Sequence, residues 1–555
     1  MFDTLKNSLT EPTQQEQAPG TVKNNAGGYV FAIDKFQQLR RFLILGTTGG
    51  TYYAGEKELT KENLTVVREC VAEDPVKTLE IVKEISVNGN APNNDPALFV
   101  LALLLSGKQA SLAYDSIPEI ARTFTHLSHL LTFIRKGKMR GWGRGFRRAV
   151  ANWYSSKSID NLSYSAIKYK SRDGFSQEDV LRLVHFGSFL TPDQRIAMQD
   201  VFHYLGYTKN KETVDYANAK INAVMQLQNL AKVDESERPK DFIAHVTRLV
   251  ELERLPMEAI PTNLRSKEVY SQLCQNPNMG WLIRNLGNLG KHELLVNGNS
   301  EFNNKIAALL RNEDHIKASK IHPLQIFVAL NQYKQGRSDK GNGQWSVVPQ
   351  IMDALTDAYH LAFKFVEPSN KKILLAVDVS GSMSGANVQI GGTQLPLFSV
   401  AGIMALSVAN VEPNYHAIAF DHEGHTRGVG KGFNSPLLGV YDLAISGRQR
   451  LDDVARILGT FRGGGTDTAL PFKFALKNKL DVDLFLTFTD NETWAGNRHI
   501  YSAMEEYRKK VNPEAKAINV AMTANRFTTH DTNPLNLEIV GFDSSIPQIV
   551  SLFAK

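Results

Sequence analysis

The chain has 555 residues, 42% of them hydrophobic and 22% charged, so it is long enough for at least two soluble domains. Its longest apolar stretches, residues 96–105 and 398–411, are shorter than the roughly 18 residues that a membrane helix needs, and its first residues lack the apolar core of a signal peptide. Cys70 and Cys274 lie far apart, which argues against a disulfide framework and favours a reducing compartment. We expect a cytoplasmic protein with no membrane partner.

The first part of the chain is predicted to be helical after a short tail. Residues 1–28 are polar and have no apolar periodicity, which predicts a disordered tail. From residue 29 to about 365, apolar residues recur at spacings of three and four in segments such as FAIDKFQQLRRFLIL and IPEIARTFTHLSHLLTFI, and no strand is predicted. Short turns between these segments predict antiparallel helix pairs stacked in a HEAT-type α-solenoid, although no strict sequence repeat is present.

Residues 366–555 have a different pattern. Compact apolar runs at 371–380, 414–420, 481–490, 517–523 and 537–542 predict strands, and helical periodicity lies between them at 396–411, 450–461, 469–480 and 499–511. Strands that alternate with helices predict a doubly wound, mostly parallel sheet. Because ligands of such sheets bind beyond the carboxyl ends of the strands, the polar residues that end these runs are the candidate functional residues.

Positive charge is concentrated in one part of the helical region. Residues 366–555 contain 18 Lys+Arg and 19 Asp+Glu, so the first 365 residues hold the remaining 45 basic and 38 acidic residues. Residues 122–172 alone contain twelve basic residues and one acid, Asp160. Glycines, Trp142 and Phe146 are interleaved with the cations, a mixture that suits phosphate contact and base stacking. The alternative is a solvated helix face whose charges pair with acids elsewhere.

Three loops of the C-terminal region carry oxygen ligands. Asp378, Ser380 and Ser382 follow the first predicted strand, Thr466 follows a run of three glycines, and Asp490 ends the run at 481–490. Two carboxylates and three hydroxyls at one end of a sheet suit Mg²⁺, with Mn²⁺ as the alternative, better than zinc. The alternative is a set of polar loops that bind no ion.

A second motif, Asp421-His422-Glu423-Gly424-His425, also resembles a metal motif. Its two histidines and its glutamate are zinc-ligand types. However, the motif follows a predicted strand and lacks the helical spacing that zinc proteases use. We therefore expect a surface loop here.

The three-loop pattern resembles the metal-ion-dependent adhesion site (MIDAS) of von Willebrand factor A domains. By that resemblance, Ser380, Ser382 and Thr466 supply hydroxyl ligands, and Asp378 and Asp490 bind directly or through water. All five positions match. In that family a carboxylate from a partner usually completes the coordination, which implies a binding module.

Four stretches of the helical region resemble signature segments of the TROVE module: residues 27–60, 141–154, 168–185 and 321–337. A TROVE module at 29–365 followed by an A domain at 366–555 is the layout of the Ro ribonucleoprotein autoantigen family. The resemblance covers residues 27–555. It implies a monomeric helical ring with a positively charged central hole, whose ends the A domain helps to join.

The same resemblance implies function and partners. Single-stranded 3′ ends of misfolded noncoding RNA enter the hole, and small structured Y RNAs bind the outer basic surface. In bacterial relatives an exoribonuclease, polynucleotide phosphorylase, is tethered through a Y RNA.

Matched by motif position, Lys168, Arg172 and His185 are implied to be outer-surface Y RNA contacts. On charge alone we extend this RNA-binding set to five further residues: Lys170, Arg140, Arg144, Arg147 and Arg148. We assign His322, Lys334 and Arg337 to the hole only as a guess, because they belong to the last TROVE-like stretch.

Three functions therefore compete. The first is an RNA-binding ring that acts in RNA quality control, small-RNA stability and exonuclease-linked RNA processing. The second is a metal-dependent protein-interaction scaffold without an RNA function. The third is a nuclease or phosphatase, which we do not expect because two-metal phosphoryl chemistry needs more clustered carboxylates than these loops offer.

Overall fold

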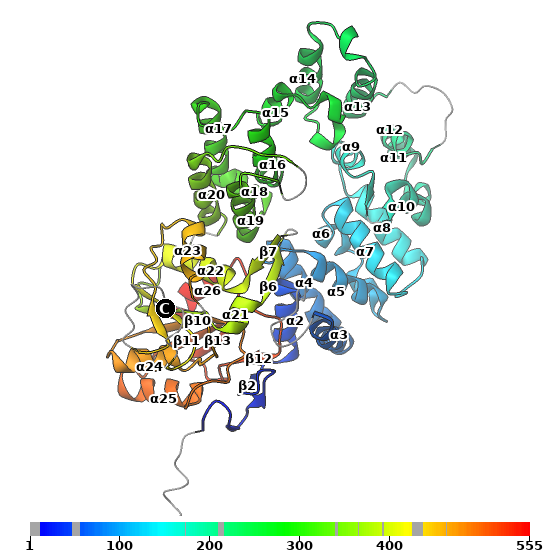
Figure 1. Ribbon diagram of the computed structural model, residues 1–555. Coiled ribbons are helices and arrows are strands. Elements are labelled where there is room, and N and C mark those ends of the chain that lie inside the picture. The colour runs from blue at the N-terminus through cyan, green and yellow to red at the C-terminus, as the bar shows by residue number, and fades with distance from the viewer. Residues whose placement is uncertain are drawn as a thin grey trace, which may run out of the picture.

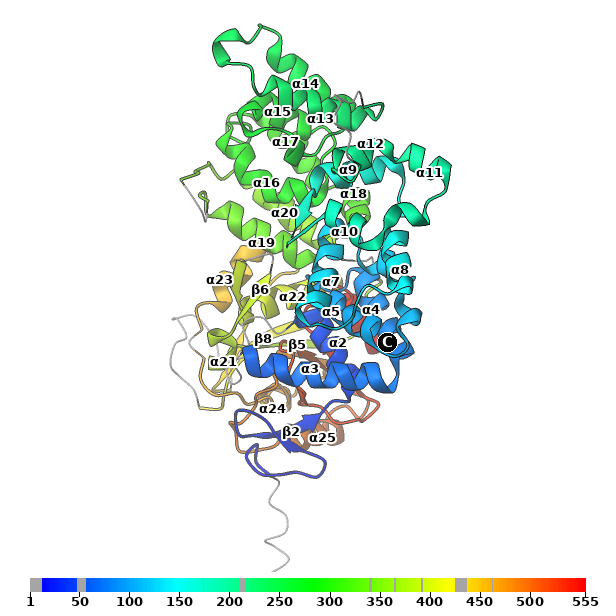
Figure 2. The same ribbon diagram turned by 90° about the vertical axis from the view of Figure 1, so that its right-hand side faces the viewer.

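The computed structural model describes residues 12–46, 56–172, 174–208, 216–338, 342–363, 366–390, 393–424, 437–461 and 463–555. Figure 1 shows helices that follow one another around a ring, with an α/β domain at its lower left, and Figure 2 shows the ring from its side. The helical ring followed by an α/β domain confirms the predicted fold class. No helix within the described ranges is long and apolar enough to span a bilayer.

The helices of the ring, which we call the helical module, fall into two arcs. The first arc consists of α2 (Lys35–Leu45), α3 (Glu56–Glu73), α4 (Pro75–Asn88), α5 (Asp95–Ser106), α6 (Ile117–Ile120), α7 (Phe124–Lys136), α8 (Arg144–Ser155), α9 (Ile159–Lys168), α10 (Gln177–Val184), α11 (Pro192–Ala197) and α12 (Gln199–Tyr204). The second arc consists of α13 (Ala219–Leu230), α14 (Phe242–Leu252), α15 (Lys267–Leu273), α16 (Met279–Lys291), α17 (Ser300–Leu310), α18 (Glu313–Ser319), α19 (Pro323–Lys334) and α20 (Pro349–Leu361).

Local sequence signals explain where many of these helices begin. The side chain of Asp34 accepts hydrogen bonds from the backbone N–H groups of Phe36 and Gln37, and Gln37 returns one to Asp34, a capping box that starts α2. The prediction of one helix through residues 31–45 was therefore wrong at its start, because Tyr29–Ala32 form strand β2. Two other short strands, β3 (Ser171–Arg172) and β4 (Phe175–Ser176), form a hairpin in the helical module where none was predicted.

The two ends of the helical ring meet at the connection between α18 and α19. The ammonium of Lys320 donates to the carbonyl of Val87 at 3.1 Å, and the amide of Gln325 donates to the carbonyl of Pro92 at 2.9 Å. Between them the buried His322 imidazole lies 3.2 Å from the carbonyl of Asn90 and 2.9 Å from that of Phe542 in the α/β domain. Three parts of the chain are thus joined at one histidine.

The α/β domain has a six-stranded sheet in the order β13-β11-β10-β5-β8-β9, parallel except for β9. Its strands are β5 (Ile373–Asp378), β8 (Tyr415–Phe420), β9 (Val440–Asp442), β10 (Leu484–Thr489), β11 (Lys516–Ala521) and β13 (Asn536–Val540), and a separate hairpin contains β6 (Asn387–Ile390) and β7 (Thr393–Pro396). Its helices are α21 (Gly381–Gly385), α22 (Leu397–Val411), α23 (Leu451–Leu458), α24 (Leu470–Lys477), α25 (Ile500–Lys510) and α26 (Ile546–Ala554). All five predicted strands are present, whereas β9, the hairpin, α21 and α26 were not predicted.

Side chains of β5 alternate between two cores. Ile373, Leu375 and Val377 pack on the face covered by α22 and α26, and that core is continuous with the core of the helical module. Leu374 and Ala376 point to the other face, where α24 and α25 cover the sheet. The side of the domain that carries α22 is thus packed into the ring, as the hydrogen bond from Tyr359 of α20 to the carbonyl of Ile403 also shows (2.6 Å).

The described part of the predicted tail is ordered, so that prediction was wrong for residues 12–28; residues 1–11 lie outside the described residues. Strand β1 (Val22–Lys23) pairs with β2, and β2 pairs with β12 (Phe527–Thr528) of the α/β domain. Asn24 donates to the carbonyl of Thr493 at 2.7 Å, and both Asn25 and the backbone N–H of Ala26 donate to the Glu492 carboxylate. Polar hydrogen bonds hold this segment, which is why apolar periodicity did not reveal it.

Candidate functional site

The three predicted ligand loops meet at the carboxyl end of the central strands. Asp378 ends β5 and Asp490 follows the adjacent parallel strand β10. The backbone N–H of Ser380 donates to Asp378 Oδ1 at 2.9 Å, and the hydroxyl of Thr489 donates to Asp378 Oδ2 at 2.7 Å. The Oγ atoms of Ser380 and Ser382 are 3.1 Å apart. The first loop therefore presents two hydroxyls beside an anchored carboxylate.

The second loop lies directly against the first. The N–H of Gly381 donates to the carbonyl of Gly464 at 2.8 Å. A Cβ atom on Gly463 would come within 1.9 Å of the carbonyl oxygen of Val379, so only glycine permits this approach. The hydroxyl of Thr493 donates to the carbonyl of Thr466 at 3.0 Å, which ties the second loop to the third.

Two oxygen atoms at this site are buried without a hydrogen-bond partner among the described residues. They are Oγ1 of Thr466 and Oδ2 of Asp490, from residues that are 0% and 1% exposed. Leaving a buried polar atom unpaired costs about 1–3 kcal/mol, and more when it is charged. The two orphaned oxygens fit a cation that they would both ligate.

The electrostatics of the two carboxylates agree with this fit. Burial and the charge of Asp490 raise the pKa of Asp378 to about 7, and burial raises the pKa of Asp490. Two carboxylates buried at the same end of the sheet favour a positive charge between them. Together with three hydroxyls they form an oxygen donor set of the kind that Mg²⁺ and Mn²⁺ prefer. Asp378, Ser380, Ser382, Thr466 and Asp490 are the residues that would hold such an ion.

The second metal-like motif does not form a separate centre. Asp421 is buried behind the second ligand loop, and the backbone N–H of Gly465 donates to Nδ1 of His422 at 3.0 Å. His425 lies outside the described residues. Across the described ranges, no three His, Cys, Asp or Glu side chains are arranged to hold a metal. Where it is described, the motif is a loop after β8 that supports the ligand loops.

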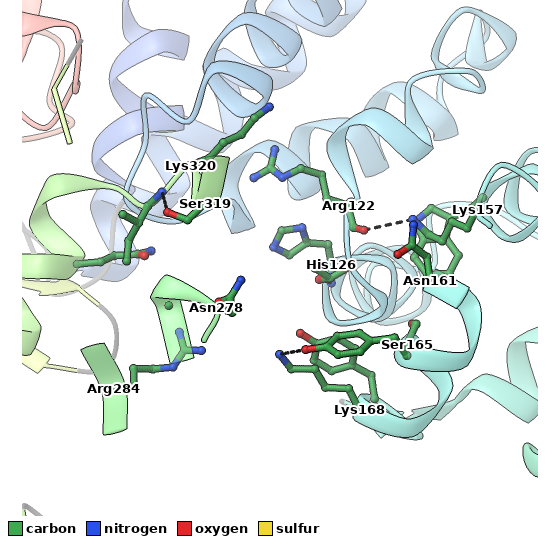
Figure 3. Close-up of a pocket in the computed structure, with 17 residues that line it drawn as sticks. Arg122, His126, Lys157, Asn161, Ser165, Lys168, Asn278, Arg284, Ser319 and Lys320 are labelled. Carbon is green, nitrogen blue, oxygen red and sulfur yellow. Dashed lines mark hydrogen bonds between the residues drawn. The ribbon is translucent and has the colours of Figure 1, made fainter. Parts of the chain in front are cut away.

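A cavity of about 610 Å³ lies inside the ring, between α7–α9 on one side and α16, α18 and α19 on the other (Figure 3). Its cationic and imidazole lining residues are Arg122, His126, Lys157, Lys168, Arg284 and Lys320. No carboxylate is among the described residues that line it. The cavity is therefore positively charged.

Four of these cations, Arg122, Lys157, Lys168 and Lys320, donate hydrogen bonds to neutral oxygens. Arg122 donates to the carbonyl of Ser86 at 2.6 Å, and Lys157 donates to the carbonyl of Arg122 at 3.3 Å. Burial lowers the pKa of Arg122 and that of Lys157, which reflects how little charge compensation surrounds them. Burial also lowers the pKa of His126 to about 4, so this imidazole is neutral at pH 7. An anion that enters the cavity would supply the missing counter-charge.

The two walls of the cavity differ in chemistry. On the α8–α9 wall, the Lys157 ammonium lies 4.3 Å from the centre of the Trp153 ring, and the Lys168 ammonium lies 5.5 Å and 5.3 Å from the ring centres of Tyr164 and Tyr169. The opposite wall is polar and carries Asn278, Arg284, Ser319 and Lys320. In Figure 3, Lys168 and Arg284 extend into the same open space from opposite walls.

The structure divides the predicted RNA-binding residues into two groups. Lys168, which the family resemblance assigned to the outer surface, ends α9 and lines the cavity. Arg172 lies on the exposed strand β3, with its guanidinium 5.4 Å from the centre of the Tyr169 ring. The Tyr169 ring, which also lines the cavity, is thus close both to Lys168 and to the exposed Arg172.

The remaining predicted RNA-binding residues lie outside the cavity lining. Lys170 is exposed beside Tyr204, and the exposed His185 caps α10 in the left-handed conformation (φ 52°). Arg144 and Arg148 are exposed on α8, Arg147 is half-buried, and the guanidinium of Arg140 packs on the Phe146 ring at 4.4 Å. In the described part of the chain, no ion pair to a carboxylate is present for these four arginines.

Of the three residues guessed to face the hole from the last TROVE-like stretch, His322 and Lys334 do not line the cavity, whereas Arg337 lies in a neighbouring hollow that Arg284 also lines. His322 is buried at the ring closure, and burial lowers its pKa to about 4. Lys334 forms a 2.7 Å ion pair with Asp452 of α23. Arg284 and Lys320 face the cavity instead. No local enrichment in charge marks these two residues, and only closure of the ring places them opposite α9.

Comparisons with known proteins agree with the fold. Residues 22–254 match the model of the TROVE domain, and residues 372–554 match the model of the Ro60 vWA domain. A protein of Deinococcus radiodurans described as "RNA-binding protein RO60" is 35% identical over 556 residues, which cover 99% of this chain and 98% of that protein. The chain belongs to the Ro60 family.

Other Ro60 relatives extend the match. A Caenorhabditis elegans protein of the same description is 28% identical, with 98% of this chain and 91% of that protein covered. The crystal structure of the Deinococcus radiodurans Ro (RSR) protein aligns with a TM-score of 0.65 at 34% identity, covering 94% of this chain and 99% of that chain. The predicted Ro family resemblance is confirmed, and the TROVE match begins at residue 22, within the predicted tail.

Proposed function

We propose that this chain is an RNA-binding protein without enzymatic activity, and that its central cavity holds single-stranded 3′ ends of misfolded noncoding RNA. The cavity lining supports this proposal, because it contains five Lys and Arg side chains and no carboxylate among the described residues. Cations that track a backbone, combined with Trp153, Tyr164 and Tyr169 for stacking, suit single-stranded nucleic acid. The family membership and the printed names of its relatives support the same proposal.

We further propose that small structured Y-like RNAs bind the outer basic surface. That surface comprises Arg140, Arg144, Arg147, Arg148, Lys170, Arg172 and His185. Most of these side chains are exposed, so a folded RNA would reach them without entering the ring. Because Tyr169 lies close to both Lys168 and Arg172, an RNA on the outer surface would also control access to the cavity. Such gating suits a role in RNA quality control and small-RNA stability, with an exoribonuclease such as polynucleotide phosphorylase as a processing partner.

For the α/β domain we propose a MIDAS-type site for Mg²⁺, with Mn²⁺ as the alternative. Its two orphaned oxygens support the proposal. The ion would supply positive charge and an open position for a partner's oxygen ligand. The chain's own residues fix the donors in place, since Asp378 is held by Ser380 and Thr489.

Fluorescence anisotropy with labelled RNA tests the cavity proposal. The variant Lys168→Gln/Arg284→Gln removes one cation from each wall, so single-strand affinity should fall and the slope of log affinity against log salt should shrink by about 1.4. The control Lys61→Gln/Arg68→Gln removes the same charge from exposed positions of α3. Equal affinities for the two double variants would reject the cavity as the binding site.

The second candidate is a metal-dependent protein-interaction scaffold, which the buried oxygen site favours. It predicts that the purified protein carries no RNA and shifts no RNA probe, while a partner dissociates when a chelator is added. Sequencing of the RNA that co-purifies with the protein separates the two proposals. A defined set of crosslinked small RNAs would exclude the scaffold without an RNA function.

A further inference from the structure

A second hollow, of about 180 Å³, adjoins the central cavity, and Arg284 lines both. Residues of α16, of α19 and of the segment after α19 line this hollow, which we call the α16–α19 groove. Its polar lining residues are Arg284, Asn288, Gln332, Arg337 and Ser338. Both arginines are exposed, and no carboxylate is among the described residues that line the groove. The positively charged lining of the cavity thus extends past Arg284 into the α16–α19 groove.

The position of Arg337 is fixed by the chain around it. Arg337 forms a β-bridge with Gln344, and the N–H of Ser338 donates to the carbonyl of Gly343 at 2.8 Å. The N–H of Trp345 donates to the carbonyl of Gly336 at 2.9 Å. These bonds close residues 336–338 onto residues 343–345, so Arg337 is presented from a constrained backbone.

Trp345 anchors this segment on α16. Its indole N–H donates to the carbonyl of Tyr333 at 2.8 Å, and its ring lies nearly parallel to that of Tyr333. A Cβ atom at Gly287 or Gly290 would come within 2.9 Å or 2.6 Å of Trp345, so the two glycines make the seat for the ring. Glycine inside a helix costs about 1 kcal/mol relative to alanine. Helix α16 therefore contains two destabilising glycines at the positions where they seat Trp345 and so fix the segment that bears Arg337.

We infer that the α16–α19 groove is a second RNA subsite, which binds the sugar-phosphate backbone of a strand where it leaves the central cavity. The inference rests on the proposed function of the cavity. Arg284 stands at the junction, and Arg337 takes a phosphate further along, since a guanidinium fork binds phosphate through paired N–H groups. The amide nitrogens of Asn288 and Gln332 already donate to Asn285 and Thr393, which leaves their amide oxygens to accept from 2′-hydroxyls.

A length series of single-stranded oligoribonucleotides tests the groove. Strands of about five nucleotides fill the cavity alone, whereas strands of about fifteen also reach the groove, both within the range of single-strand sites. Arg337→Gln should leave the affinity for the short strand unchanged. It should lower the affinity for the long strand and reduce the slope of log affinity against log salt for that strand by about 0.7. Arg337→Lys keeps the charge but loses the paired N–H groups of the guanidinium. Its affinity for the long strand should therefore lie between that of wild type and that of Arg337→Gln.

Exposed Arg68 of α3 provides the matched control, because Arg68→Gln removes the same charge away from the groove. The groove inference is overturned if Arg337→Gln binds the long strand as tightly as Arg68→Gln does, or if wild type binds long and short strands equally. The cavity proposal fails separately, if wild type binds neither strand. Circular dichroism of Arg337→Gln checks that its fold matches wild type.

Discussion

Arg41 of α2 and Glu538 of β13 form an ion pair that is buried between the helical module and the α/β domain. The Arg41 side chain is 1% exposed and that of Glu538 is 10% exposed. Arg41 also donates to the carbonyls of Asn525 and Phe527, at 2.8 Å and 2.6 Å. Asn525 in turn donates to the carbonyl of Asp490, one of the candidate ion ligands, at 2.8 Å. A continuous buried polar network therefore connects α2 with the third ligand loop.

Replacing Arg41 by Met should lower the free energy of unfolding by about 3–5 kcal/mol, because Glu538 would stay buried without its counter-charge. Urea denaturation followed by circular dichroism measures the change. Neighbouring Arg40 offers a matched control, since it pairs with Glu84 in an exposed position and such pairs contribute about 0–1 kcal/mol. The double variant Arg41→Met/Glu538→Gln should recover part of the loss. Similar effects of Arg40→Met and Arg41→Met would contradict the buried-pair account.

Substituting Gly28 by Ala should detach the N-terminal segment from the α/β domain. The added Cβ would come within 2.0 Å of the carbonyl oxygen of Thr493. Loss of this contact would also release the hydrogen bonds of Asn25 and Ala26 to Glu492. Limited proteolysis should then cut residues 12–33 faster than in wild type. Gly143→Ala is the control, because nothing lies within 4 Å of its Cβ position, and equal cleavage rates would refute the contact.

The stability contributed by His322 should depend on pH. Burial holds its folded-state pKa at about 4, below the ordinary value of 6.5. The contribution is therefore complete above pH 6.5 and is lost as pH falls toward 4, because the unfolded state takes up the proton first. The difference in free energy of unfolding between wild type and His322→Gln should therefore become smaller as pH falls through that window, by up to about 1.4 kcal/mol per pH unit. A constant difference for His322→Gln across this window would disprove the linkage.

Mg²⁺ should stabilise the protein through Thr466. A ligand at a hundred times its dissociation constant adds about 2.7 kcal/mol. Thr466→Val removes the orphaned Oγ1 at nearly constant volume, so it should reduce the rise in melting temperature on adding Mg²⁺ without destabilising the chelator-treated protein. The control is Thr468→Val, whose hydroxyl is also buried and unpaired in the described structure. It should keep the full Mg²⁺ response, and equal responses of both variants would remove Thr466 from the ligand set.

Variants of the outer surface and of the cavity should separate two RNA activities. Arg172→Gln/His185→Gln should weaken binding of a small structured RNA and leave a short single strand unaffected. Lys168→Gln should do the reverse, because its ammonium lines the cavity. Competition binding with both RNA types measures the two effects. Identical profiles would mean that the cavity and the outer surface form one site.

That the three candidate ligand loops meet at one end of the sheet was predictable because their residues are tied to strong local patterns. Asp378 and Asp490 each end a buried apolar run, and adjacent parallel strands bring such ends together. The order of helices and strands was predictable for the same reason. Residues 12–28 escaped prediction because their order comes from hydrogen bonds of Asn24 and Asn25 to a distant loop, which leave no periodic signal.

The cavity was predictable only in part. Lys168 belongs to a visibly basic segment, whereas Arg284 and Lys320 lie in ordinary sequence and become partners of Lys168 only when the ring closes. Short-range charge counting finds a cationic surface, but it cannot tell the inner face of a ring from its outer face.

The pairing of the first strands with the last domain has a consequence for how the protein is made. Asn25 and Glu492 are 467 residues apart in the chain. At about 5–20 residues per second, a ribosome needs on the order of 20–90 seconds to synthesise the stretch between them. The N-terminal segment that contains Asn25 leaves the ribosome long before the loop to which it binds. The N-terminal segment therefore cannot dock before the loop that contains Glu492 has been synthesised.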